Sequence, residues 1–213
     1  MQVNICAKPT DFGRFFVAKM SISDIMYVKN LWGETTMLNS NVKQRVSVTK
    51  QLIYGLIATL CAVVLPQLAH LIGDALGVQT ALGEILLPMH LPVIFIGLLA
   101  GPIAGGVAGV CSPLVSFALT GMPKAVMLPF ILIEVATYGI VAGFLKQANI
   151  SNLVKVILVQ VAGRVVKAIA ILVVFYAFDG KVAPIVIWTT LYMGVAGMAI
   201  QWLAIPYFVK KAQ

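Results

Sequence analysis

Residues 153–178 read LVKVILVQVAGRVVKAIAILVVFYAF. A helix of about 20 apolar residues crosses the roughly 30 Å hydrocarbon core of a bilayer, and this run is long enough to do so. Its centre nevertheless contains Arg164 and Lys167. Each charge at that depth costs about 2.5–3.5 kcal/mol. The two cations therefore require a partner, a hydrated cavity or a ligand.

The composition of the whole chain agrees with a membrane protein. Of 213 residues, 61% are hydrophobic and 10% are charged, and the mean hydropathy is +1.00. These values lie outside the range of soluble domains, so we predict an all-α integral membrane protein. The net charge of +8 is explained by basic residues in short loops, which orient membrane proteins, and we expect no nucleic-acid partner.

The apolar pattern predicts six transmembrane helices, interrupted by a Gly101-Pro102 break and by the turn signal of residues 120–123. The second helix is short and needs its flanks to cross a bilayer. Residues 73–89 are too polar to span, and we expect them to form an outer loop after the first helix. The predicted helices cover about residues 50–73, 91–100, 103–119, 125–145, 153–178 and 182–208.

The first 42 residues differ from the rest, because three of the seven acidic residues lie there. They contain no apolar core of a secretory signal. We expect residues 1–42 to be either a disordered cytoplasmic tail or sequence upstream of a true start at Met37. Residues 43–213 are expected to form the six-helix membrane domain.

Basic residues mark one end of the predicted bundle. Seven cations fall at the ends that six spans would place inside, against two at the outer turns. The positive-inside rule then places both termini in the cytoplasm. The inner cations are Lys43, Arg45, Lys50, Lys146, Lys155, Lys210 and Lys211, and the outer ones are Lys124 and Lys181.

Gln160, Arg164 and Lys167 fall within about 60° of one another on a helix, so we predict one polar face. Glu134 is the acidic residue inside a predicted span, at a depth similar to that of Arg164. A salt bridge to Glu134 would leave one positive charge unmatched. That charge suits a hydrated pocket for a carboxylate, a phosphate or an electron-rich heterocycle. Alternatively, the three ions only join helices.

Aromatic side chains surround these ions along the sequence. Phe130 and Tyr138 lie one turn before and after Glu134, which would allow them to sandwich a planar ring. Trp188 and Tyr192 lie in the outer half of the last helix, where they would either close over the same ligand or form the aromatic belt at the membrane interface.

Metal and hydrolase sites are not indicated. His70 and His90 have no HExxH motif or carboxylate partner, and we expect neither metal nor cofactor. Ser112 lies in GVCSPLVS, which lacks the GxSxG of a serine hydrolase.

Small residues recur at four-residue spacing in three predicted helices, which indicates close helix contacts. Ala58 and Ala62 of the first helix would pack internally or dock a separate membrane protein. The glycines of this pattern are Gly101, Gly105, Gly109, Gly139 and Gly143.

Three stretches together resemble the S components of energy-coupling factor (ECF) transporters: LPMHLPVIFIGLLAGPIAGGVAG (residues 87–109), SPLVSFALTGMP (112–123) and MLPFILIEVATYGIVAGFL (127–145). The resemblance covers roughly residues 45–210. It implies a six-helix, vitamin-binding subunit of the bacterial cytoplasmic membrane, with an outer loop after helix 1 that closes over the substrate.

The resemblance also implies partners and site residues. The subunit would have no ATPase and would not be an enzyme. It would bind a water-soluble vitamin or precursor and dock, through Ala58 and Ala62, on a membrane T component with two ATP-binding subunits. The chain has no GxxxxGK[ST] motif for ATP binding, which agrees with ATP being bound by the partner subunits. The candidate substrate-binding residues are His90, Phe130, Glu134, Tyr138, Gln160, Arg164, Lys167, Trp188 and Tyr192.

Two other classes stay open from the residues alone. One is an intramembrane enzyme that acts on a lipid or peptide through His90 or Ser112. The other is a structural membrane subunit in which the buried ions only hold helices together. The vitamin itself is not indicated by the sequence.

Overall fold

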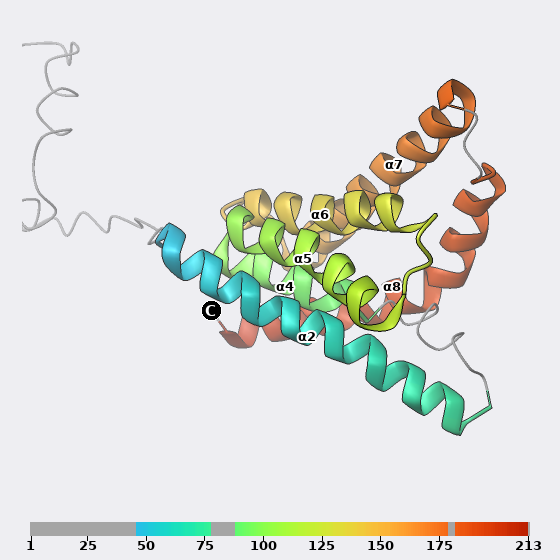
Figure 1. Ribbon diagram of the computed structural model, residues 1–213. Helices are drawn as coiled ribbons and strands as arrows, with labels where there is room; N and C mark the ends of the chain where they lie inside the picture. The colour runs from blue at the N-terminus through green and yellow to red at the C-terminus, as the bar shows by residue number, and fades with distance from the viewer. Residues whose placement is uncertain (1–45, 78–87, 179–181, 213) are drawn as a thin grey trace, which may run out of the picture. The chain divides into compact units, whose positions relative to one another are not determined.

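The computed structural model describes residues 46–77, 88–178 and 182–212, and these form helices and short connections without a strand. The predictions for residues 1–42 and for most of the 73–89 loop fall outside the described residues. Figure 1 shows the helices, which are α2 (Val48–Ala75), α4 (His90–Ala100), α5 (Pro102–Thr120), α6 (Leu128–Leu145), α7 (Asn152–Phe178) and α8 (Ile185–Ala212).

Five of these helices are long and apolar enough to cross a membrane, which confirms a helical, multi-pass membrane protein. The exception is α4, predicted as the second span. Its 11 residues cover only about 16 Å, half of a typical hydrocarbon core. The helix is therefore confirmed, but by its own length it does not span.

Local sequence explains where the helices end. Gly101 has a φ of 123°, a backbone conformation that favours glycine, and it separates α4 from Pro102 at the start of α5. The predicted break is thus confirmed. The fourth helix begins at Leu128 rather than 125, because the amides of Met127 and Leu128 both donate to the carbonyl of Lys124 in a turn.

Three further helix boundaries, in α2 and α8, also differ modestly from the prediction. Helix α2 continues to Ala75 instead of ending at Gly73. Helix α8 runs from Ile185 to Ala212, so it starts later and ends later than the predicted range of 182–208. Apolar periodicity does not mark a helix end as sharply as a capping residue does.

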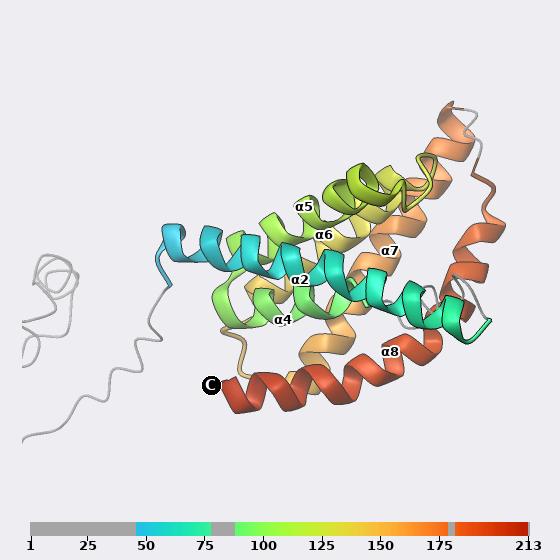
Figure 2. The same cartoon turned by 60° about the horizontal axis from the view of Figure 1, so that its bottom comes forward.

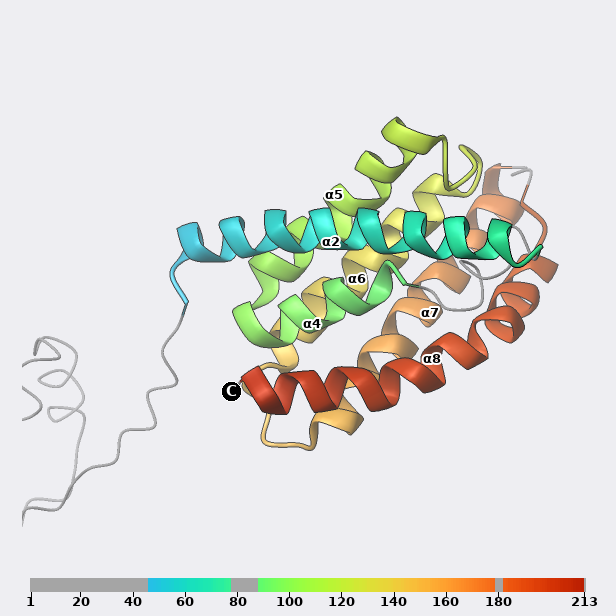
Figure 3. The same ribbon diagram turned by 90° about the horizontal axis from the view of Figure 1, so that it is seen from below.

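Helix α6 is central among the described helices. It packs against α4, α5 and α7, while α2 lies on α4 and α5, and α8 lies on α7 and α4 (Figures 2 and 3). The start of α2, the α4–α5 turn, the α6–α7 connection and the end of α8 lie at one end (Figure 3). This end carries Lys50, Lys146, Lys155, Lys210 and Lys211, the described members of the predicted inner set.

Contacts between elements hold this end together. The side-chain oxygen of Gln51 accepts a hydrogen bond from the Ile103 amide at 3.3 Å, which ties α2 to the start of α5. Lys155 is buried, and its Nζ donates to the Lys146 carbonyl at 3.2 Å. This hydrogen bond joins the first turn of α7 to the residue that follows α6.

The glycine pattern brings α5 and α6 into close contact, as predicted. A Cβ on Gly139 would overlap the carbonyl of Gly105, and a Cβ on Gly105 would overlap the carbonyl of Gly139. A Cβ on Gly109 or on Gly143 would likewise overlap backbone atoms of the facing helix. Inside a membrane the hydrophobic effect does not drive helices together, because lipid tails are as apolar as the side chains. Close packing of backbones at small residues is therefore a main source of membrane helix association.

Ala58 and Ala62 of α2 are buried inside the bundle. They form an apolar cluster with Val93, Ala108 and Val135, from α4, α5 and α6. This is the internal packing role that the sequence allowed. Partner docking at these two alanines, the role implied by the resemblance, would require the helices around them to separate.

Candidate functional site

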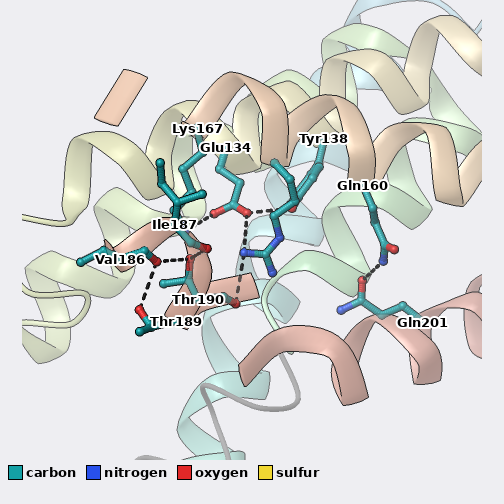
Figure 4. Close-up of polar contacts among 10 residues, drawn as sticks. Glu134, Tyr138, Gln160, Lys167, Val186, Ile187, Thr189, Thr190 and Gln201 are labelled. Carbon is teal, nitrogen blue, oxygen red and sulfur yellow. Dashed lines mark hydrogen bonds and ion pairs between the residues drawn. The ribbon is translucent and has the colours of Figure 1, made fainter. Parts of the chain in front are cut away.

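A buried carboxylate between two cations is the main polar feature of the bundle (Figure 4). Glu134 on α6 is 1% exposed. Its Oε1 lies 3.2 Å from Nη1 of Arg164, and its Oε2 lies 2.8 Å from Nζ of Lys167. Arg164 and Lys167 are three residues apart on α7 and therefore face α6 from the same side. The salt bridge expected from the sequence is present.

Two aromatic side chains extend this cluster toward α4. The hydroxyl of Tyr138 donates to Oε1 of Glu134 at 2.8 Å. The His90 ring meets the Tyr138 ring edge to face, with centroids 5.0 Å apart. Both residues are buried. Tyr138 thus contacts the ion cluster directly, and His90 contacts it through the Tyr138 ring.

The cluster has an excess of one positive charge, since one carboxylate faces two cations. Arg164 Nη1 makes a further, long contact of 3.5 Å with the Thr190 carbonyl on α8. Its Nε and Nη2 are buried and have no hydrogen-bond partner among the described residues. Leaving a buried donor unpaired costs about 1–3 kcal/mol, and more for a charged group.

A cavity of about 180 Å³ lies beside these cations, between α7 and α8. Arg164, Lys167 and Thr190 are its polar lining residues, and the remaining wall is mostly apolar. Trp188, which is 69% exposed, reaches this cavity from α8. The lining residues are Arg164, Val165, Lys167, Ala168, Ile171, Ile187, Trp188, Thr190 and Leu191.

Gln160 lies on the helical face of Arg164 and Lys167, as predicted, but its hydrogen bonds go to other partners. Its side-chain nitrogen donates to Gln201 on α8 at 2.9 Å, and its oxygen accepts from Trp202 at 2.6 Å. Gln160 and Gln201 are both buried. The hydrogen bond between Gln160 and Gln201 joins α7 to α8 about one helical turn from Arg164.

Phe130 and Tyr138 do not form two walls of one cavity, which corrects the predicted sandwich. Phe130 packs with Ile171 and Val182 and lines a separate cavity of about 410 Å³ between α6 and α7. That cavity has entirely apolar lining residues. Tyr138 is instead bonded to Glu134.

Tyr192 is 81% exposed and is not among the described residues that line the cavity with Trp188. Sequence reasoning missed Thr190, Gln201 and Trp202. Gln201 could have been found by the signal that identified Gln160, a long polar side chain within an apolar helix. Nothing in the sequence marks the Thr190 carbonyl, because a backbone group acquires its role only when α8 packs on α7.

The fold and the site together define a helical, multi-pass membrane protein with a buried, positively charged cluster beside a small cavity. Comparison of the chain with models of protein families, with curated proteins and with solved structures finds no match.

Proposed function

We propose that this protein is the substrate-binding membrane subunit of an ECF-type transporter. It binds a water-soluble vitamin or vitamin precursor at Arg164 and Lys167. It releases the ligand inward after docking on a membrane partner with two ATP-binding subunits. In this proposal the short α4 completes a six-helix bundle in the bacterial cytoplasmic membrane, and both termini face the cytoplasm.

The observation that carries the proposal is the unmatched positive charge beside the cavity. A second cation beside one buried carboxylate adds a desolvation cost of several kcal/mol that the single negative charge does not fully offset. Here Arg164 keeps two buried donor nitrogens without a partner among the described residues, next to a 180 Å³ space. An anionic ligand would satisfy both the charge and the donors.

Further support comes from the charge distribution and the sequence. The lysines gathered at one end of the described bundle fit a cytoplasmic end by the positive-inside rule. The chain carries no GxxxxGK[ST] phosphate-binding motif, so energy for uptake would come from other subunits.

The test is to purify the protein from its native host in mild detergent, without ATP, and to record its native mass spectrum. The proposal predicts a one-to-one complex with a small molecule that also rebinds to stripped protein. A protein that arrives empty and binds nothing from a host extract would refute it. Turnover of a lipid or peptide that is lost in Ser112→Ala or His90→Ala would instead establish an enzyme.

Trp188 and Tyr192 offer a matched pair for locating the ligand. Both are exposed aromatic residues on α8, but only Trp188 lines the cavity. We expect Trp188→Ala to weaken binding of the co-purified molecule about tenfold, equivalent to about 1.4 kcal/mol of lost aromatic contact. Tyr192→Ala should leave the Kd unchanged in the same titration. Equal effects of the two substitutions would place the ligand elsewhere.

A further inference from the structure

We infer that the ligand is a small monoanion whose single carboxylate is held side-on by the Nε and Nη2 edge of Arg164. This inference rests on the proposed function and narrows its substrate class. Three observations carry it: the edge of the guanidinium that is free, the net charge of the cluster, and the size and lining of the cavity.

The first observation concerns which donors of Arg164 are already used. Nη1 contacts Glu134 at 3.2 Å and the Thr190 carbonyl at 3.5 Å. Nε and Nη2, which have no partner among the described residues, are neighbours on one edge of the planar guanidinium. Their N–H bonds point in parallel, which is the geometry that two oxygens of a carboxylate match. A neutral amide can offer only one oxygen acceptor to this edge.

The second observation is the charge balance. Two cations and one carboxylate give the cluster a net charge of +1. One carboxylate makes the loaded site neutral. A phosphate monoester carries about −1.5 to −2 near neutral pH and would leave a buried negative excess. In a buried site such an uncompensated charge is strongly unfavourable, so the balance favours a carboxylate over a phosphate.

The third observation is the cavity itself. Its volume is about 180 Å³, which is small beside the roughly 300–1,000 Å³ typical of pockets for drug-sized ligands. Apart from the cations and Thr190, its wall consists of aliphatic side chains and Trp188. Such a space accepts a compact apolar or aromatic body attached to the carboxylate.

Access to the edge requires a local movement. Nε and Nη2 are closed off from solvent, and the nearest α8 contact of Arg164 is the long bond to Thr190. The α8 wall at Thr190 must shift outward, which breaks the long contact between Nη1 of Arg164 and the Thr190 carbonyl. The carboxylate then replaces it with two charge-assisted hydrogen bonds.

Benzoate, benzamide and phenyl phosphate test the inference, since they share one ring and differ in the group offered to Arg164. Calorimetric titration of each into stripped wild-type protein should give a Kd for benzoate at least tenfold lower than for the other two. Arg164→Lys keeps the charge but removes the parallel donors, so it should weaken benzoate about 10- to 100-fold. The melting temperature of the unliganded variant checks that it is folded.

Several results would overturn the carboxylate assignment. They are benzamide or phenyl phosphate binding as tightly as benzoate, no measurable benzoate binding, or an unchanged Kd in folded Arg164→Lys. The wild-type comparison decides the matter even if the variant does not fold. A co-purified molecule that is neutral or doubly charged would also refute the assignment, yet it would leave the proposed transport function standing. Only a protein with no ligand at all would remove both.

Discussion

Glu134→Gln should lower the free energy of unfolding by about 3–5 kcal/mol, the usual cost of breaking a buried ion pair from one side. Glu134 is 1% exposed and is the partner of both Arg164 and Lys167. The amide is nearly isosteric with the carboxylate, so packing is kept while the negative charge is lost. Two cations are then left on α7 without a negative charge, and the ion pairs that join α6 to α7 are lost.

Denaturant unfolding of the detergent-solubilised protein measures this effect. Thr137→Val is a suitable control on the same helix, because the Thr137 hydroxyl bonds the Ile133 carbonyl of its own helix and, among the described residues, no neighbouring helix. It should cost well under 1 kcal/mol. Adding Lys167→Gln to Glu134→Gln should restore part of the loss, since the double variant carries one unpaired cation instead of two. Full stability of Glu134→Gln would mean that the cluster is hydrated rather than buried.

Gly139→Ala should destabilise the protein by about 3 kcal/mol, at the upper end of the usual cost of overpacking. The added methyl group would overlap the backbone carbonyl of Gly105. Neither backbone can move without separating α5 from α6, and α6 also carries Glu134. We therefore expect weaker ligand binding as a secondary effect of this substitution.

Gly106→Ala provides the matched control for Gly139→Ala. A Cβ at Gly106 would lie 3.3 Å from Cγ1 of Ile140, a side chain that can shift. Alanine also favours the helix over glycine by about 1 kcal/mol, so this variant should equal or exceed the wild type. Unfolding curves of the two variants, measured together, decide the point. Equal stability of both would contradict the close α5–α6 contact.

The sequence predicts the ion cluster because its chemistry leaves few choices. Two cations in an apolar run need compensation, and Glu134 is the acidic residue at matching depth in another apolar run. Their pairing follows without knowledge of the helix arrangement. The glycine spacing predicts close contact of α5 and α6 for a similar reason, since small residues are required wherever two backbones meet.

The sequence does not predict which neighbouring helix each residue of a polar face contacts. Gln160 shares a helical face with Arg164, yet it bonds Gln201 while Arg164 bonds Glu134. The difference arises because both α6 and α8 pack on α7, and helix packing depends on contacts across the whole bundle. The same limit explains Phe130, which shares a face with Glu134 but lines a different cavity.

Thermal unfolding of the ligand-free wild-type protein and of its Arg164→Met variant distinguishes between two roles of Arg164. The residue either binds the ligand or only joins helices. If the unmatched charge of Arg164 serves to receive a ligand, it destabilises the protein while the site is empty. Methionine removes this charge and leaves Glu134 and Lys167 as a neutral pair 2.8 Å apart. We then expect the ligand-free variant to be at least as stable as the wild type, although the co-purified molecule no longer stabilises it. A ligand-free variant less stable by about 3–5 kcal/mol, still stabilised by that molecule, would show that Arg164 only joins helices.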